Sequence, residues 1–434
     1  MTIYNISVAI KTNTAPENLY YDMELYKTDW SGNETFALRP TGKHPLQADY
    51  KTQVHPSLDI SDPPETCYIL SIDIYRKVGV DYIKMNQDPI TAIMPLKGFQ
   101  TTDKDWGASR EFEYFETAQD TKKAEDGQVN TYKLNISSKP RIFEAKEHPI
   151  GDPLDPFTKQ KVEEELKIRM TRPFKSYIYD LTKSPQENGK IKDYYDLVGI
   201  YPNQAASMFC GPAAFFYCVQ KDRPDIYQQV IKELWQSGKT KIGSLKLEAD
   251  KSVRHPKGFF TDNGTVKIPA IDWIVMASLR DTENTGLFSI NSPSAGFLWW
   301  NWAGAVTMWG VLEKWFKRAG ATKKYDNISI AHSNLQDVCN LNKYIGKDTH
   351  VVTLIGSGML AEDNPQLKNH WIVLEGKLKI KDSEEEVTIS TPLSSLVELE
   401  VFSWGKVKNR IRNGLTLGEF LKYIYGGMVF TKIP

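Results

Sequence analysis

The 434-residue chain has few cysteines, no excess of either charge and no clear targeting segment. Four cysteines are too few and too scattered to frame a fold of this length with disulfides, and they indicate free thiols in a reducing compartment. Lys and Arg together number 54, as do Asp and Glu, so no basic surplus is available to neutralise phosphates and we expect no nucleic-acid partner. The four cysteines are Cys67, Cys210, Cys218 and Cys339.

Signal sequences and long hydrophobic stretches are also scarce. The N-terminal sequence MTIYNISVAIK has no basic region, no long apolar core and no small-residue cleavage site, so we expect no Sec-type signal peptide. Residues 287–312 carry no charge and are long enough to span a bilayer, but their first part is polar, which favours a buried or pocket-lining helix. We therefore expect a protein that is cytoplasmic in the producing cell, with export by a route other than Sec left open and membrane contact as a minor alternative.

Two further absences limit the chemistry. Cys and His pairs at zinc-ligand spacing are missing, and so is a Gly-rich phosphate loop. We therefore expect no metal ion and no cofactor. What the sequence does have is a globular composition, with 41% hydrophobic and 25% charged residues, and a length that predicts two or three domains.

The hydrophobic periodicity changes along the chain and divides it into parts. Residues 1–140 alternate apolar and polar residues, which predicts an antiparallel, β-sandwich-like domain; without a catalytic constellation, we expect it to serve targeting or binding. Residues 141–195 are a predicted connector, broken by prolines, in which residues 159–170 have helical spacing. A second domain over residues 196–434 follows. The predicted strands of the first domain include residues 4–10, 68–74, 112–114 and 132–136.

Candidate chemistry concentrates in residues 203–217. Cys210 precedes Gly211, Pro212 and an unbroken apolar run, so we expect it to begin a buried helix. The positive pole of that helix would favour the thiolate and lower the pKa of the thiol. Gln204, six residues upstream, could place its amide N–H beside the Cys210 backbone N–H and form an oxyanion hole. An ordinary buried cysteine and a loop glutamine explain the same pattern.

A nucleophilic thiol needs a base, and His370 is the strongest candidate among the histidines of the second domain. It precedes an apolar strand that Gly376 ends, where an imidazole can face a nucleophile on a neighbouring helix. His350, which opens the apolar run 351–355, is the second choice. His255 and His332 are better explained as loop or strand-end residues.

Gln204, the sequence CGPAA at 210–214 and the sequence HWIVL at 370–374 together resemble the papain-like cysteine peptidase superfamily. The nearest likeness is to its bacterial Cys-Gly-Pro branch, which includes exporter-associated and NlpC-like peptidases. The resemblance covers about residues 196–434 through these short motifs. It implies an α+β domain in which a nucleophile helix packs on an antiparallel sheet, with Cys210 as nucleophile, His370 as general base and acid, and Gln204 as oxyanion donor.

One position departs from the family pattern. The family usually orients its histidine with an Asn or Asp just before Ser-Trp-Gly, and here Phe402 occupies that position. Ser403 and Glu400 are the alternatives, and a third is that no orienting group exists, which would slow the reaction because the imidazole tautomer would be less well fixed. A strand that ends on a packed tryptophan explains Ser403–Gly405 equally well.

These expectations describe a cysteine-dependent amide hydrolase, either a peptidase or a peptidoglycan amidase, acting on a peptide, a protein or peptidoglycan. By analogy, the β-rich first domain without a Sec signal suggests a bacterial effector toxin, with a secretion apparatus and an immunity protein as candidate partners. One alternative is a transglutaminase-like acyl transferase that uses the same Cys and His. The other is a non-enzymatic binding or membrane-active protein that uses the tryptophan-rich segment 299–302. That segment and residues 280–284 could also line a substrate groove.

Overall fold

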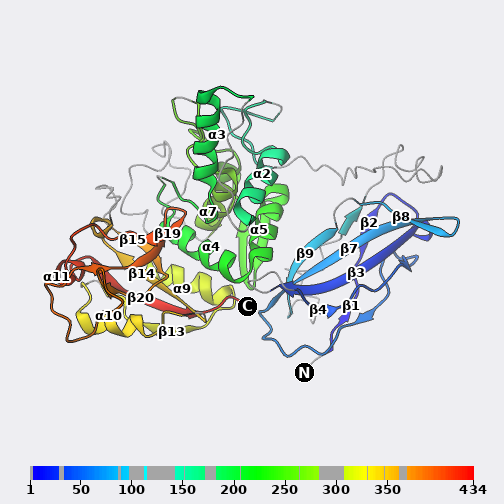
Figure 1. The fold of residues 1–434 in the computed structure, drawn as a ribbon. Coiled ribbons are helices and arrows are strands. Elements are labelled where there is room, and N and C mark those ends of the chain that lie inside the picture. The colour runs from blue at the N-terminus through cyan, green and yellow to red at the C-terminus, as the bar shows by residue number, and fades with distance from the viewer. Residues whose placement is uncertain are drawn as a thin grey trace. The chain divides into compact units, whose positions relative to one another are not determined.

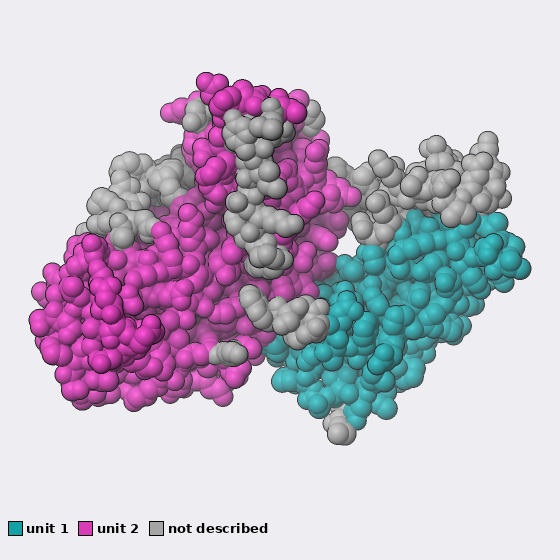
Figure 2. Space-filling model, in the orientation of Figure 1, with its two compact units in different colours: residues 1–141, 241–244, 434 teal, residues 142–240, 245–433 magenta. Residues whose placement is uncertain are grey.

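A computed structural model gives the fold of the chain, and Figure 1 shows its helices and strands. Unit 1 comprises residues 1–141, 241–244 and 434, and unit 2 comprises residues 142–240 and 245–433 (Figure 2). The class is mixed α+β with several antiparallel sheets, as the sequence predicts. The structure describes residues 3–28, 34–86, 89–96, 112–114, 142–150, 152–171, 182–205, 207–262, 264–282, 307–329, 331–346, 348–360 and 369–434.

Unit 1 is built on an antiparallel sheet with strand order β4-β3-β7-β8, in which β5 also pairs with β3 and β9 with β7. Two smaller pairs accompany it, β1 antiparallel to β6 and β2 parallel to β10. The strands are β1 (Asn5–Ile6), β2 (Ile10–Thr12), β3 (Leu19–Thr28), β4 (Glu34–Leu38), β5 (His44–Pro45), β6 (His55–Pro56), β7 (Cys67–Val78), β8 (Asp81–Lys84), β9 (Ile90–Pro95) and β10 (Phe112–Tyr114), and a 3₁₀ turn covers Pro16–Asn18.

The alternation seen in the sequence builds the centre of this sheet. Strand β3 buries every second residue from Leu19 to Leu25 and leaves those between half-buried, as expected for a strand with one face on a core. The predicted strands at 68–74 and 112–114 are confirmed, whereas the one predicted at 4–10 forms as two short strands, β1 and β2, and the one at 132–136 lies outside the described residues. The sandwich arrangement itself stays a prediction.

Unit 2 combines helices with a six-stranded antiparallel sheet of order β13-β20-β14-β15-β18-β19. No helix in the described part of the chain is long and apolar enough to cross a membrane. The helices are α2 (Lys159–Met170), α3 (Pro185–Val198), α4 (Cys210–Asp222), α5 (Pro224–Ser237), α6 (Lys251–Arg254), α7 (Ala270–Thr282), α9 (Trp309–Arg318), α10 (Leu335–Asn342) and α11 (Leu417–Phe420), with a 3₁₀ turn at Ser357–Met359. The strands after β10 are β11 (Lys239–Ile242), whose last two residues belong to unit 1, β12 (Leu245–Glu248), β13 (Lys323–Asp326), β14 (Thr349–Ile355), β15 (His370–Leu374), β16 (Lys379–Ile380), β17 (Val397–Glu398), β18 (Glu400–Ser403), β19 (Lys406–Asn409) and β20 (Ile424–Thr431).

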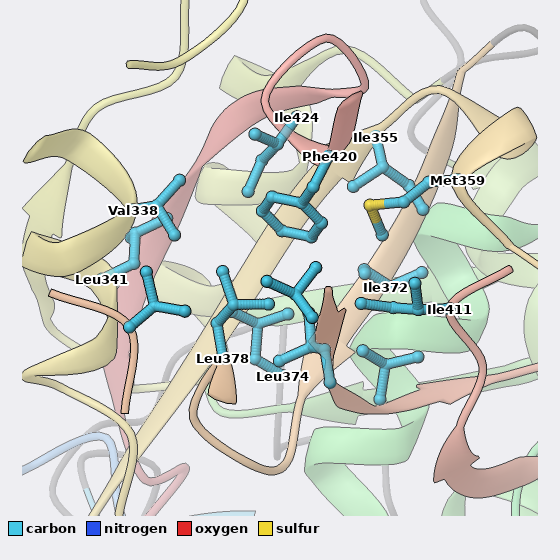
Figure 3. Packing of buried hydrophobic residues seen from close by; sticks show 14 of the residues in the cluster. Val338, Leu341, Ile355, Met359, Ile372, Leu374, Leu378, Ile411, Phe420 and Ile424 are labelled. Atoms are coloured by element: carbon cyan, nitrogen blue, oxygen red, sulfur yellow. The ribbon is translucent and has the colours of Figure 1, made fainter. Parts of the chain in front are cut away.

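The two faces of the six-stranded sheet pack on different helices. On one face, Val338 of α10 and Ile372 of β15 belong to a single aliphatic cluster (Figure 3). On the other face, the ring of Phe402 in β18 stacks on that of Tyr217 in α4, with centroids 3.9 Å apart. Because successive side chains of a strand point to opposite faces, α10 and α4 cover opposite sides of the sheet. Burial of both faces explains why β14 and β15 read as nearly continuous apolar runs.

The helix predicted at residues 159–170 forms with those bounds, and it packs within unit 2. Its Glu165 is 1% exposed and accepts hydrogen bonds from the Tyr194 hydroxyl of α3 at 2.6 Å and from the backbone N–H groups of Ala270 and Ile271 at 3.1 and 2.8 Å. A carboxyl group at a helix N-terminus satisfies N–H groups that have no acceptor within the helix. Glu165 therefore joins α2, α3 and the start of α7.

The buried Glu165 should make the stability of unit 2 depend on pH. Burial, with a smaller contribution from Asp272, raises the pKa of Glu165 from its usual 4.5 to about 7. The folded state then binds more protons than the unfolded state between these values, so the free energy of unfolding should fall by up to about 3 kcal/mol as pH rises from 4.5 to 7. Denaturant titration across this range should show the loss in the wild type but not in Glu165→Gln. Glu164→Gln, which changes an exposed neighbour, is the control; parallel curves for all three proteins would contradict the prediction.

Candidate active site

Cys210 is the first residue of α4, as the sequence predicts. Its sulfur accepts a hydrogen bond from the backbone N–H of Trp371, the second residue of β15. Alternate N–H groups of a strand point the same way, and the N–H of Glu375 donates to the carbonyl of Glu400, so the N–H of Trp371 also points toward β18. The sulfur therefore occupies the place that β18 leaves free when it turns away after Ser403.

Burial raises the pKa of the Cys210 thiol, so the expectation of a lowered pKa is wrong. The residue is only 5% exposed, and a thiolate there would lose most of its solvation. The N–H of Trp371, the guanidinium of Arg280 and the N–H of Gly211 act in the opposite direction but do not compensate. A position at a helix N-terminus is thus insufficient to ionise this thiol.

His370 heads β15, fully buried, and two groups hold its ring. Its Nε2 atom and the hydroxyl oxygen of Ser403 are 2.7 Å apart, and its ring stacks on the indole of Trp404 with centroids 4.5 Å apart and planes at 13°. Burial, together with the positive charge of Arg410, lowers the pKa of His370 to about 3, so the ring is neutral at physiological pH. Of the two suggested orienting groups, Ser403 makes the contact, whereas Glu400 is exposed on β18.

Cys210 and His370 lie at the same end of the sheet, but no hydrogen bond joins their side chains. The sulfur contacts the peptide N–H that directly follows His370, but the Nδ1 atom of His370 has no hydrogen-bond partner among the described residues. A buried ring nitrogen without a hydrogen-bond partner costs free energy. Such unpaired groups can mark a catalytic role. His370 shares the face of Ile372, which α10 covers, whereas α4 covers the other face, so the contact that the structure shows is between the sulfur and the peptide N–H after His370.

A two-residue turn holds Trp404 against His370. Strands β18 and β19 pair as far as Ser403 and Lys406, which leaves Trp404 and Gly405 as the turn, with φ of 41° and 70°. Positive φ at both positions is typical of a type I′ hairpin, and it strains a residue other than glycine. A Cβ atom at Gly405 would in addition lie 2.8 Å from that of Asn203. The turn therefore packs closely against the loop that precedes α4.

Gln204 lies in that loop and stabilises it. The residue is 1% exposed, and its Nε2 donates to the carbonyl of Ser207 at 3.1 Å, while the Ser207 hydroxyl donates to the carbonyl of Gln204 at 2.6 Å. No hydrogen bond joins its amide to Cys210 in the described part of the chain. The role of Gln204 as oxyanion donor therefore stays a prediction.

A buried ion pair anchors the same loop. Arg169 of α2 and Asp272 of α7 are both fully buried, and the guanidinium donates to the two carboxylate oxygens at 2.8 and 2.7 Å. Arg169 also donates to the carbonyls of Val198 and Gly199 at 2.6 and 3.1 Å, and Asp272 accepts from the N–H of Asn203 at 3.0 Å. The pair thus fixes both ends of the segment that leads to Gln204.

His350, the second candidate base, lies at the C-terminal end of α4, away from Cys210. Its Nε2 atom is 2.6 Å from Oδ2 of Asp222, and both residues are buried. Asp222 is the last residue of α4, which places it about 18 Å along the helix axis from Cys210 at 1.5 Å per residue. His350 is therefore a structural partner of Asp222, and Cys218 is likewise a buried core residue as expected.

The structure adds three residues that the sequence analysis did not assign to the site. Trp404 covers His370, and the Ser-Trp-Gly motif was the available signal for it. Arg410 lies buried behind Trp404, with its guanidinium carbon 5.5 Å from the ring centroid. Thr307 packs so closely on Gly211 that a Cβ atom there would lie 2.3 Å from its hydroxyl oxygen. No local pattern marks Arg410 or Thr307: Arg410 contacts Trp404 across the β18–β19 hairpin, and Thr307 contacts a residue distant in sequence.

Two other expectations bear on this region. Arg280 of the suggested groove segment does act on the Cys210 thiol, whereas residues 283–306, which include the tryptophan-rich segment, lie outside the described residues. Within the described part of the chain, no group of three or more His, Cys, Asp or Glu side chains could hold a metal ion.

Loss of the buried ion pair should destabilise unit 2 strongly. Asp272→Asn leaves the Arg169 guanidinium buried without its counter-charge, for which we expect a loss of about 3–5 kcal/mol in the free energy of unfolding. Asp196→Asn, which breaks the exposed pair with Lys192, should cost at most about 1 kcal/mol. Denaturant unfolding of both variants tests this, and equal losses in the two would show that burial of the pair has no energetic importance.

Comparison with protein-family models, with curated proteins and with solved structures found no match. The likeness to papain-like peptidases therefore rests on the residues of this chain alone.

Proposed function

We propose that unit 2 contains a papain-like cysteine hydrolase domain in which Cys210 attacks an amide carbonyl. The observation that carries the proposal is the position of the Cys210 sulfur, at the head of a buried helix and against the N–H that follows a buried histidine. Ser403 and Trp404 hold the ring of that histidine from two directions. A nucleophile, a base and an orienting group are the parts that covalent hydrolysis needs.

The proposed reaction uses both nitrogens of His370. With Nε2–H donating to the Ser403 oxygen, Nδ1 is free to accept the thiol proton while the sulfur forms a bond to the carbonyl carbon. Nδ1 then returns that proton to the leaving amine as the carbon–nitrogen bond breaks. Water, activated by the same nitrogen, next hydrolyses the thioester and restores the thiol. The first step requires the thiol and Nδ1 to come into contact, because no hydrogen bond joins the two side chains in the structure. Catalytic contacts often tighten only when substrate binds.

The oxyanion would lie near the start of α4. The first N–H groups of a helix have no acceptor within it, and those of Cys210 and Gly211 are directed at the sulfur. They can donate to a developing negative charge on the substrate oxygen. Gln204 is the second proposed donor, through the N–H that does not bond to Ser207.

The wider biological role is also a proposal. We propose that the β-rich unit 1 serves targeting, in a bacterial effector delivered by a contractile injection apparatus, and that unit 2 acts on a protein or on peptidoglycan stem peptides. An immunity protein in the producing cell would be the natural inhibitor. Deletion of residues 1–140 should then abolish delivery while leaving hydrolysis by unit 2 intact, and delivery that survives the deletion would contradict the targeting role.

The hydrolase proposal can be tested with the full chain in heavy-oxygen water. We expect wild type, incubated with purified sacculi or a proteome-derived peptide library, to release fragments whose new carboxyl group carries one heavy oxygen, because water cleaves the thioester. Cys210→Ala and His370→Ala should lose this activity, whereas Cys218→Ala, which changes a core thiol of the same helix, should retain it. Mass spectrometry reads both the cleavage and the label.

Other outcomes would favour the two alternatives. Products joined to an amine and free of heavy oxygen would identify an acyl transferase. Vesicle leakage that is equal for wild type and Cys210→Ala, without cleavage of either substrate pool, would identify a membrane-active protein and overturn the hydrolase.

The hydroxyl of Ser403 should matter for rate rather than for binding. Ser403→Ala removes one hydrogen bond to the imidazole, which corresponds to a fall in kcat of about fivefold to tenfold with KM little changed. Ser403→Thr retains a hydroxyl at the same position and should restore most of the activity. An alanine variant with wild-type kcat would leave His370 without a proposed orienting group.

A further inference from the structure

Thr307 places a buried hydroxyl group beside the first turn of α4. The residue is 6% exposed, and its Oγ1 atom has no hydrogen-bond partner in the described part of the chain. A Cβ atom built on Gly211 would lie 2.3 Å from this oxygen, so the hydroxyl occupies the space that the glycine leaves open at the second residue of the helix. A buried hydroxyl without a partner costs free energy and calls for an explanation.

The position of Thr307 is fixed from the sheet by Trp371 of β15. The indole N–H of this tryptophan donates to the carbonyl of Thr307 at 2.8 Å, and its backbone N–H donates to the sulfur of Cys210. Trp371 is itself buried. One residue of the sheet therefore holds both the thiol and the residue that carries the unpaired hydroxyl.

The N-terminus of α4 offers hydrogen-bond donors and positive charge. The first intrahelical hydrogen bond is donated by the N–H of Ala213, and Pro212 has no N–H. The N–H groups of Cys210 and Gly211 therefore have no acceptor within the helix, and both are directed at the sulfur. The guanidinium of Arg280 adds a positive charge that acts on the same sulfur. Such surroundings favour a negatively charged oxygen.

We propose that the Thr307 hydroxyl, together with the N–H groups of Cys210 and Gly211, binds the anionic oxygen that forms when the Cys210 sulfur adds to a carbonyl group. The inference rests on the hydrolase function proposed above and adds a catalytic residue to it. As the sulfur bonds to the carbonyl carbon, the carbonyl electron pair moves to the oxygen. The hydroxyl then donates a hydrogen bond to this oxygen and gains in the transition state the partner that it lacks in the resting site.

Valine at position 307 separates this role from packing. Thr307→Val keeps the shape of the side chain and removes the unpaired hydroxyl, so it should leave the protein at least as stable as wild type in denaturant unfolding. Thr353→Val is the matched control, because the hydroxyl of Thr353 is also buried and without a partner in the described part of the chain. Thr353 pairs with Ile372 on the face of the sheet that α10 covers, away from the start of α4.

The test compares two reactions of Cys210 in the full-length protein at pH 8 and needs no natural substrate. p-Nitrophenyl acetate acylates a thiol through a tetrahedral oxyanion; p-nitrophenolate leaves as its carbon–oxygen bond breaks, and the thiol proton goes to the buffer. Iodoacetamide alkylates the same thiol by direct displacement of iodide and forms no oxyanion. Mass spectrometry measures both rates at Cys210, and their ratio is independent of the fraction of thiolate.

We expect Thr307→Val to acylate about 10- to 100-fold more slowly than wild type, as for loss of a hydrogen bond to a charged group, with alkylation unchanged. Thr307→Ser retains a hydroxyl and should keep most of the wild-type ratio, and Thr353→Val should keep all of it. An unchanged ratio in Thr307→Val would overturn the proposal. So would an unfolded Thr307→Val variant, because the hydroxyl would then be structural, or a folded wild type that reacts with neither reagent.

Failure of this inference is separable from failure of the hydrolase proposal. If the ratio falls as expected but neither sacculi nor the peptide library is hydrolysed, the oxyanion site stands and the hydrolase is wrong. If Thr307→Val hydrolyses substrate as fast as wild type, the hydrolase stands and the hydroxyl has no part in its reaction.

Discussion

The hydrogen bond from the Trp371 N–H to the Cys210 sulfur is the contact on which the candidate site depends. It exists because β18 turns away at Trp404 and Gly405, leaving an N–H of β15 without a neighbouring strand. The N-terminus of α4 fills that gap with sulfur in place of a carbonyl oxygen. The same turn brings Trp404 onto His370, so one local departure from regular pairing frees the N–H that the sulfur contacts and places the ring that covers the imidazole.

Buried charged side chains stabilise the loop and the helices around this contact. Arg169 and Asp272 hold the loop before α4 from α2 and α7, and Glu165 joins the same helices. Such pairs gain little over apolar packing but are costly to break singly, which makes them effective at fixing one loop conformation. The segment that the sequence suggested as a connector therefore contributes directly to the geometry around Gln204.

Patterns within one element could be predicted from the sequence, and contacts between distant elements could not. The helix beginning at Cys210 and the strand beginning at His370 follow from the proline in a first turn and from an apolar run. The pKa of Cys210 was predicted in the wrong direction, because the positive pole of a helix is a local property whereas desolvation depends on everything packed around the sulfur. The pairing of His350 with Asp222 and the stack of Arg410 on Trp404 likewise join residues that no spacing rule connects.

Burial raises the pKa of the thiol and lowers the pKa of the imidazole, and both shifts favour the neutral form. The pKa of Cys210 is raised and that of His370 is lowered to about 3, so transfer of the proton between them is uphill in the resting site. A substrate that displaces contacts around Thr307 or adds a negative charge near the ring would reduce that cost, since it would change the solvation or the field at His370. Reactivity of the proposed hydrolase would then be coupled to substrate binding.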